Sequence, residues 1–176
     1  MSIDHDLLTK TVRESTAEVF STMLGIELEQ GEAFVTKSPA AAGDGVLAFI
    51  GLAGRWVGTG SVSVSGALAC HLSSRFLTSD YRSVDDDVLD AMGELTNMII
   101  GNVKTTLEES LGPMGLTIPT VIYGRNFTSR TLGTQEGTKV LFHMNGERME
   151  IHVCLALNRD NVRLRPSFNV QSLLMH

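Results

Sequence analysis

The sequence has few of the residues that mark disulfide-rich or nucleic-acid-binding proteins. Only two cysteines, Cys70 and Cys154, occur among 176 residues, and neither lies in a CxxC or Cys/His cluster. They cannot build a disulfide framework, so we expect reduced, structural thiols. Basic residues number 14 against 20 acidic ones, for a formal net charge of -6. This charge argues against non-specific nucleic-acid binding, which needs a cationic surface.

Long apolar runs are missing as well. No stretch approaches the roughly 18 consecutive apolar residues of a membrane-spanning helix. Residues 1–10 carry acidic and polar side chains where a signal peptide has a basic start and an apolar run. We therefore expect a cytosolic protein that does not enter the membrane. The hydrophobic content of 43% suits one ordinary core, and no repeat or low-complexity tract divides the chain, so we expect a single domain over residues 1–176.

Residues 83–111 show the clearest helical pattern in the chain. Ser83 is the expected N-cap, the aspartates at 85–87 suit the positive end of a helix dipole, and Gly112-Pro113 is a stop signal. Apolar residues recur at spacings of three and four, which predicts a long amphipathic helix with one face in the core. The residues of this stripe are Val88, Met92, Leu95, Ile99 and Val103.

The opposite face of this helix carries Glu94 and Asn97, which are neighbours because they stand three residues apart. Gly93 and Gly101 flank the pair. A glycine inside a helix costs about 1 kcal/mol relative to alanine, so two of them need an explanation. Either another surface approaches this face closely, or the glycines pack beneath a neighbouring element and Glu94 and Asn97 are ordinary solvated residues. The spacing alone leaves both explanations open.

Hydrophobic periodicity predicts further elements. Helical spacing over residues 4–24, followed by Gly25, indicates a first amphipathic helix. We predict an α/β fold of the α+β kind, an antiparallel sheet with long amphipathic helices packed on it. The other predicted elements are short strands at 26–29 and 33–36 in a segment that is otherwise loop, a hairpin of 46–52 with 56–65, a short helix at 67–77, a strand at 118–123, and either a strand or a helix in 158–176.

The strongest hairpin signal is Asn145-Gly146, which joins strands predicted at 139–144 and 147–157. Pairing of Met144 with Glu147 would place His143 and His152 on a solvated face, each opposite a basic residue, so we expect no metal site there. The glycines of residues 51–60 lack the following Lys-Ser/Thr of a phosphate loop, which argues against a nucleotide site. The core face of the hairpin would hold Val140, Phe142, Met149, Ile151, Val153 and Leu155.

Residues 90–104, DAMGELTNMIIGNVK, resemble the signature helix of the CheC/CheX chemotaxis phosphatases, in which a Glu, two further residues and an Asn are followed by Gly-Asn and a Lys. The glycine-punctuated hairpin, the short helix after it and the acidic lead-in at 84–88 look like the CheX branch of that family. The CheC branch typically carries a second motif in its first helix. Here Glu14 is followed three residues later by Ala17, and Glu18 by Ser21, so the chain has one motif, as in CheX.

The resemblance implies hydrolysis of the phosphoryl-aspartate of a CheY-like response-regulator receiver domain. Asn97 would hold the attacking water in line with the phosphorus, and Glu94 would pair with the active-site lysine of the receiver. Gly93 and Gly101 would let the receiver approach the helix closely. Lys104 would either support the receiver contact or pair with Glu108 on its own helix.

No cofactor is expected in this chain, because receivers bring their own Mg²⁺ and no acidic cluster of matching spacing occurs here. The resemblance also implies a homodimer joined through sheet edges. Two other functions stay open: a non-catalytic module that docks receiver or flagellar-switch proteins, and a sensory accessory domain that binds a small molecule between sheet and helices. The presence of both Glu94 and Asn97 favours catalysis over docking alone.

Overall fold

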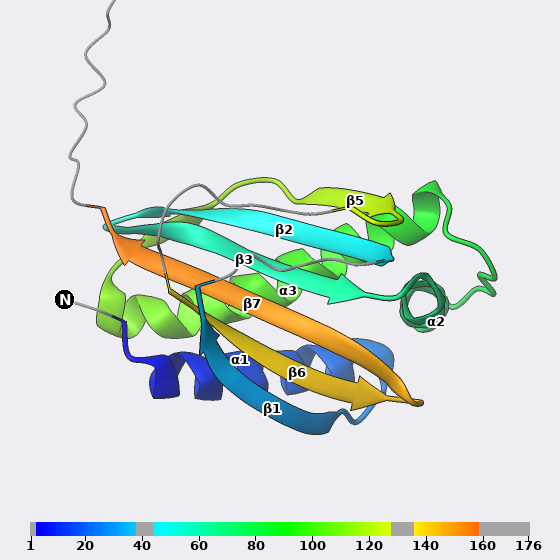
Figure 1. Cartoon of the computed structure of the whole chain (residues 1–176), viewed down its shortest axis with the longest axis horizontal. Coiled ribbons are helices and arrows are strands. Elements are labelled where there is room, and N and C mark those ends of the chain that lie inside the picture. Colours follow the sequence, from blue (N-terminus) through cyan, green and yellow to red (C-terminus); the bar gives the residue numbers. More distant parts are fainter. Residues whose placement is uncertain (1–2, 38–43, 128–135, 159–176) are drawn as a thin grey trace, which may run out of the picture.

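A computed structural model describes residues 3–37, 44–127 and 136–158, so most of the segment at 158–176 lies outside the described residues (Figure 1). Within them, the strands form one antiparallel sheet in the order β1-β6-β7-β3-β2-β4, and β5 also pairs with β2, along a different part of that strand from β4. The predicted fold class is confirmed. The strands are β1 (Glu29–Thr36), β2 (Gly45–Gly54), β3 (Trp56–Val64), β4 (Met114–Leu116), β5 (Thr120–Gly124), β6 (Gly137–Met144) and β7 (Glu147–Leu157).

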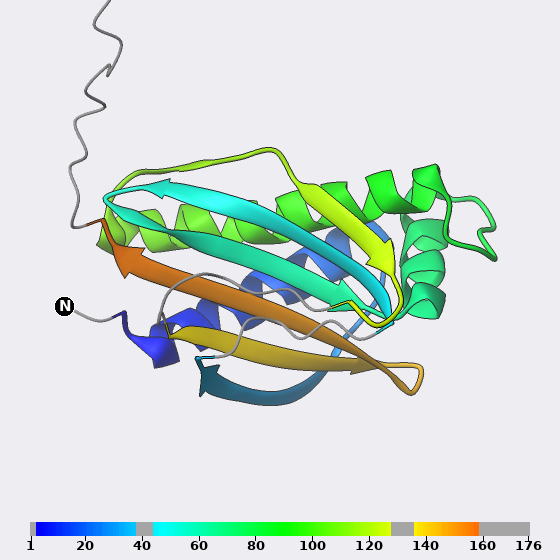
Figure 2. The ribbon, with the colours of Figure 1, turned by 45° about the horizontal axis from the view of Figure 1, so that its top comes forward.

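The helices α1 (His5–Val19) and α3 (Asp86–Leu111) lie side by side on one face of the sheet, and α2 (Gly66–Leu77) lies at one end (Figures 1 and 2). A π-helical turn, Phe20–Leu24, continues α1 and ends at Gly25, whose φ of 62° is left-handed. Glycine adopts that conformation without a steric penalty, so the predicted stop at Gly25 is confirmed.

The long helix begins two residues later than predicted. Its N-cap is Asp85, which has extended backbone and whose Oδ1 accepts the Val88 N–H at 3.0 Å. Ser83 is therefore not the cap. A carboxylate satisfies a first-turn N–H and also complements the helix dipole, and this favours Asp85 over a hydroxyl two residues earlier.

The core forms between the two long helices and the inner face of the sheet. All five residues of the predicted α3 stripe are at most 1% exposed. The predicted register of β6 and β7, with Met144 opposite Glu147, is confirmed, and the six hairpin residues predicted to face the core are all buried.

The outer face of the same hairpin is less solvated than predicted. The Lys139 and Glu150 side chains are only 11% and 13% exposed and form an ion pair at 2.8 Å. Burial lowers the pKa of His152, and the charge of Lys139 lowers this pKa further. The long side chains lie over the sheet, where Lys139 Nζ is 6.0 Å from the centre of the Phe34 ring. These side chains cover one another, which an alternating pattern cannot reveal.

Two strand predictions need correction. The strand predicted at 26–29 is absent except for Glu29, because the Ile26 N–H donates to Phe20 O and ties this segment to the helix end. The predicted strand at 118–123 begins only at Thr120, and β4 precedes it. Pro119 has no N–H to donate to a strand, which explains the interruption.

Candidate functional site

Glu94 and Asn97 lie, as predicted, on the face of α3 that points away from the core. Glu94 is exposed and Asn97 is half-buried. Among the described residues, neither side chain has a hydrogen-bond or ion-pair partner. Both are therefore available to an incoming molecule. A free carboxylate beside a free carboxamide, which can both donate and accept, can bind a cation and a water at adjacent points.

Gly93 is buried, so the prediction that both glycines lie on an exposed face is wrong for this one. A Cβ at Gly93 would stand 3.3 Å from Val121 Cγ2 and 3.7 Å from Pro119 Cβ. The missing side chain lets the segment before and within β5 pack directly on the helix. For Gly93, packing beneath a neighbouring element is therefore the correct explanation.

Gly101 is half-buried and less crowded. A Cβ there would lie 4.0 Å from Leu116 Cδ1, an ordinary van der Waals distance. Gly93 and Gly101 thus mark two points along α3 at which the segment of residues 116–121 runs beside the helix. This segment forms one wall of the site, at the sheet edge that Figure 2 shows in yellow-green. The motif could not reveal this wall, although the Ile118-Pro119 step gave a signal that a strand is interrupted there.

Lys104 pairs with Glu108, which was one of its two predicted partners. Lys104 Nζ lies 2.9 Å from Glu108 Oε2, and Glu108 Oε1 accepts the Met114 N–H at 2.7 Å. The Met114 hydrogen bond, and after it the hydrogen bond from Lys104, lower the pKa of Glu108. Glu108 therefore fastens the end of α3 to the start of β4.

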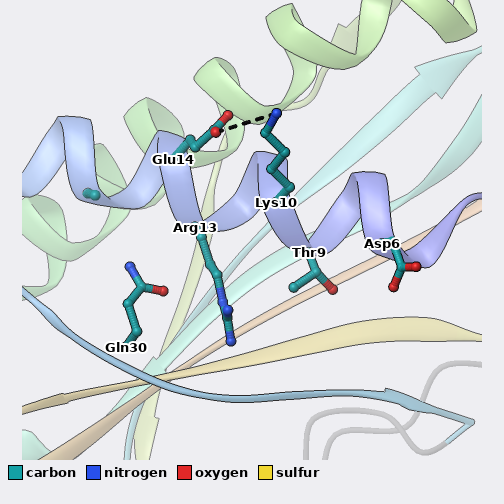
Figure 3. A pocket seen from close by; sticks show the side chains of 7 residues that line it. Asp6, Thr9, Lys10, Arg13, Glu14 and Gln30 are labelled. Carbon is teal, nitrogen blue, oxygen red and sulfur yellow. Dashed lines mark ion pairs between the residues drawn. The ribbon is translucent and has the colours of Figure 1, made fainter.

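Two hollows of about 430 Å³ each open beside the long helices. The first adjoins the N-terminal half of α3 and is lined by Asp86, Leu89, Asp90, Pro119 and Val121. The second lies between α1 and β1, where Arg13 donates to Gly31 O at 2.8 Å and Lys10 lies 3.8 Å from Glu14 (Figure 3). Two acidic and two basic side chains line the second hollow, so its lining favours neither an anionic nor a cationic ligand. It is lined by Asp6, Thr9, Lys10, Arg13, Glu14, Ala17 and Gln30.

The described part of the chain contains no group of three or more His, Cys, Asp or Glu side chains that could hold a metal ion. No helix among residues 3–37, 44–127 and 136–158 is long and apolar enough to cross a membrane.

The model of the family described as "Chemotaxis phosphatase CheX" matches residues 46–143, more than half of the chain, and this match includes Glu94 and Asn97. The chain belongs to the CheX family. Its mixed helical and antiparallel-sheet structure has the CheC-like fold of solved relatives.

Individual CheX relatives agree with this assignment. The CheY-P phosphatase CheX of Thermotoga maritima is 30% identical over 120 residues, which are 68% of this chain and 77% of the relative. A putative chemotaxis protein from Desulfovibrio vulgaris Hildenborough superposes with a TM-score of 0.77 at 31% identity and covers 85% of this chain and 96% of its own. A chain of the CheX-CheY-BeF3-Mg²⁺ complex from Borrelia burgdorferi has a TM-score of 0.74 at 26% identity and covers 87% of this chain and 98% of its own.

Proposed function

We propose that this CheX-family protein hydrolyses the phosphoryl-aspartate of a CheY-like receiver domain. The observation that carries the proposal is the pair formed by exposed Glu94 and half-buried Asn97, both without a partner among the described residues, on one turn of α3. Two relatives add support. One is described as a CheY-P phosphatase, and the other is a chain of a CheX-CheY complex.

In the proposed reaction, a water oxygen attacks the phosphorus as the bond between phosphorus and the aspartyl oxygen breaks. The aspartate leaves as a carboxylate, and the proton of the water goes to the released phosphate. Asn97 would orient the water, because a carboxamide can accept one hydrogen bond and donate another while it stays neutral. In phosphoryl transfer the protein mainly positions groups and stabilises charge, so a neutral positioning residue suits this chemistry.

Glu94 would bind the active-site lysine of the receiver. Docking would remove water from this ion pair, which would fix the orientation of the receiver more than it would add net affinity. The metal would come with the partner, since receivers hold their own Mg²⁺. No step in this proposal requires a cofactor bound to this chain.

The other predicted site residues take different parts in the proposal. Gly101 stays a contact position, because it is half-buried and carries no side chain. Gly93 would act through the packing of Pro119 and Val121. Lys104 would act through Glu108, which holds the end of α3.

We further propose a cytoplasmic homodimer. Strand β1 lies at one edge of the described sheet and carries two exposed apolar side chains, Phe34 and Val35. An unpaired edge with exposed apolar residues can add a strand from a second copy. Light scattering after size-exclusion chromatography would test this state, and a monomer at all concentrations would contradict it.

The test of the catalytic proposal is kinetic. CheY-like receivers from the source organism would be phosphorylated with a small-molecule donor, and phosphate loss would be followed with and without this protein. We expect acceleration that is lost in Asn97→Ala and kept in Glu109→Gln, a control at an exposed glutamate of α3. Acceleration that survives Asn97→Ala would remove the role of Asn97. Binding without acceleration would identify a docking module instead.

A further inference from the structure

Ile118 is the most exposed large apolar residue in the described part of the chain. It is 86% exposed, and the next such residue, Tyr123, is 52% exposed. A single exposed apolar side chain is ordinary on a protein surface and by itself indicates nothing. The position of Ile118 next to the proposed site distinguishes it from the others.

The packing of residues 116–121 against α3 places Ile118 along the stretch of helix between Gly93 and Gly101, which includes Asn97. Leu116 lies by Gly101, and Pro119 lies by Gly93. The eight residue steps from Gly93 to Gly101 span about 12 Å along the helix. The three residue steps from Leu116 to Pro119 span at most about 10 Å, so the segment runs antiparallel to the helix over a similar length. Residue 118 therefore falls between the two ends, within about one helical turn of Asn97.

The backbone around Ile118 is held in place. The Thr117 N–H donates to Gly51 O at 3.0 Å, and the Gly51 N–H donates to Thr117 Oγ1 at 2.9 Å. The flanking strands β4 and β5 both pair with β2, and Pro119 has a fixed φ. Ile118 is thus an apolar group on a preorganised support, and such a group loses little backbone entropy when a partner covers it.

The charge next to Ile118 indicates what kind of surface would cover it. Asp86 and Asp90 line the hollow that Pro119 also borders, and Glu94 is the next outward residue of α3. The site therefore combines an apolar point with an acidic border and a free carboxamide. This combination suits a protein surface with an apolar patch and cationic side chains, and it does not suit a free anion.

We propose that Ile118 is a receiver-binding anchor, which inserts into an apolar patch of the receiver while Asn97 meets the phosphoryl group. The identity of the occupant rests on the proposed function. The anchor contact involves none of the reacting atoms and is made equally before and during the reaction. It therefore contributes to affinity and leaves the chemical step unchanged.

The test compares Ile118→Ala with Ile122→Ala. Ile122 is also an exposed isoleucine, at 37%, but it pairs with Leu47 on the other face of the sheet. CheY-like receivers of the source organism, loaded with beryllofluoride and Mg²⁺, would be titrated against each variant. We expect Ile118→Ala to raise Kd about tenfold, the usual size for a central apolar contact. Ile122→Ala should change Kd less than twofold, and kcat for the phosphorylated receiver should change less than twofold in both variants.

The outcomes separate this inference from the proposed function. An unchanged Kd in Ile118→Ala, together with turnover that is lost in Asn97→Ala, would overturn the anchor and leave the phosphatase standing. Equal losses of affinity in the two isoleucine variants would also overturn the anchor. A wild-type protein that neither binds nor dephosphorylates these receivers would overturn both. Thermal unfolding of each variant would show whether a loss of affinity comes from a loss of folding. If Ile118→Ala proves unstable, the Ile118→Ser variant, provided that it is stably folded, would have to give the same rise in Kd.

Discussion

The outward faces of α1 and α3 differ far more than their inward faces. A shift of 80 residues aligns Thr16 with Thr96, both 0% exposed, and each hydroxyl donates to the carbonyl four residues earlier, at 2.6 and 2.7 Å. The same shift aligns buried residues along both helices. The buried pairs are Leu8 with Val88, Val12 with Met92, Val19 with Ile99 and Phe20 with Ile100.

On the outward side the same shift aligns Glu14 with Glu94 and Ala17 with Asn97. Packing on this sheet therefore does not require an amide at that position. The flanks differ as well, since Arg13 reaches Gly31 O from the position that corresponds to Gly93. The comparison shows that the fold does not need an amide at position 97, which is consistent with the proposed role of Asn97.

The largest expected effect comes from replacing Asn97 of α3 with alanine, the residue at the aligned position of α1. Asn97→Ala should reduce the acceleration of receiver dephosphorylation by on the order of 100-fold, because the attacking water loses its positioning group. The melting temperature should change by no more than about 2 °C, because no described residue bonds the Asn97 side chain. Phosphate release and thermal unfolding would measure the two effects. A melting temperature that falls strongly would instead give Asn97 a structural role.

The next largest effect comes from replacing Gly93 of α3 with arginine, the residue at the aligned position of α1. Gly93→Arg should lower the free energy of unfolding by roughly 3 kcal/mol, because even a Cβ at Gly93 meets Val121 at 3.3 Å and the rest of the side chain must displace the wall. Chemical denaturation would measure it. The reciprocal Arg13→Gly should cost less, about 1 kcal/mol, mainly from helix propensity. Equal losses of stability in Gly93→Arg and Arg13→Gly would show that the two positions are packed alike.

A smaller effect, of opposite sign, is expected at the second glycine of α3. Gly101→Ala should stabilise the protein by up to about 1 kcal/mol, because alanine favours helix and the new methyl would meet Leu116 at an ordinary 4.0 Å. If Gly101 is a receiver contact, the same variant should weaken receiver binding. A stabilised protein with unchanged Kd would remove Gly101 from the contact surface.

The smallest effect concerns pH and the end of α3, where Glu108 has no counterpart in the shorter α1. The folded protein lowers the pKa of Glu108 below its ordinary 4.5, so the unfolded state takes up the proton first as pH falls. The stability that Glu108 contributes is full above pH 4.5 and is lost below it. Glu108→Gln should therefore show a shallower loss of stability below pH 4.5 in urea denaturation. If the dependence of stability on pH were the same in Glu108→Gln and in the wild type, the Glu108 carboxylate would not be held by its hydrogen bonds in solution.

The sequence predicted the elements whose signals are local. Helical spacing found α1 and α3, and Asn145-Gly146 found the β6–β7 hairpin with its register. The errors arose where contacts with residues distant in the sequence determine whether a side chain is buried. Gly93 is buried only because Pro119 and Val121 pack on it, and the Lys139–Glu150 pair is shielded only because neighbouring strands bring long side chains together.

The candidate site shows the same division. Glu94 and Asn97 were found from their spacing and from the resemblance of their helix, and both face outward. Ile118 was not found, because its place along α3 depends on how two strands of the sheet edge pair with β2. No sequence pattern within residues 114–124 predicts that these strands pair with β2.

The contact between Thr117 and Gly51 brings a third part of the chain into the site. Gly51 lies within β2, and a Cβ there would come within 3.0 Å of Thr117 Cγ2. A side chain at 51 would therefore crowd Thr117, the residue next to Ile118. A glycine 46 positions before Asn97 in the sequence thus helps to set where the segment around Ile118 stands relative to α3. If the proposed function holds, exchanges at position 51 would change which receiver fits without altering Glu94 or Asn97.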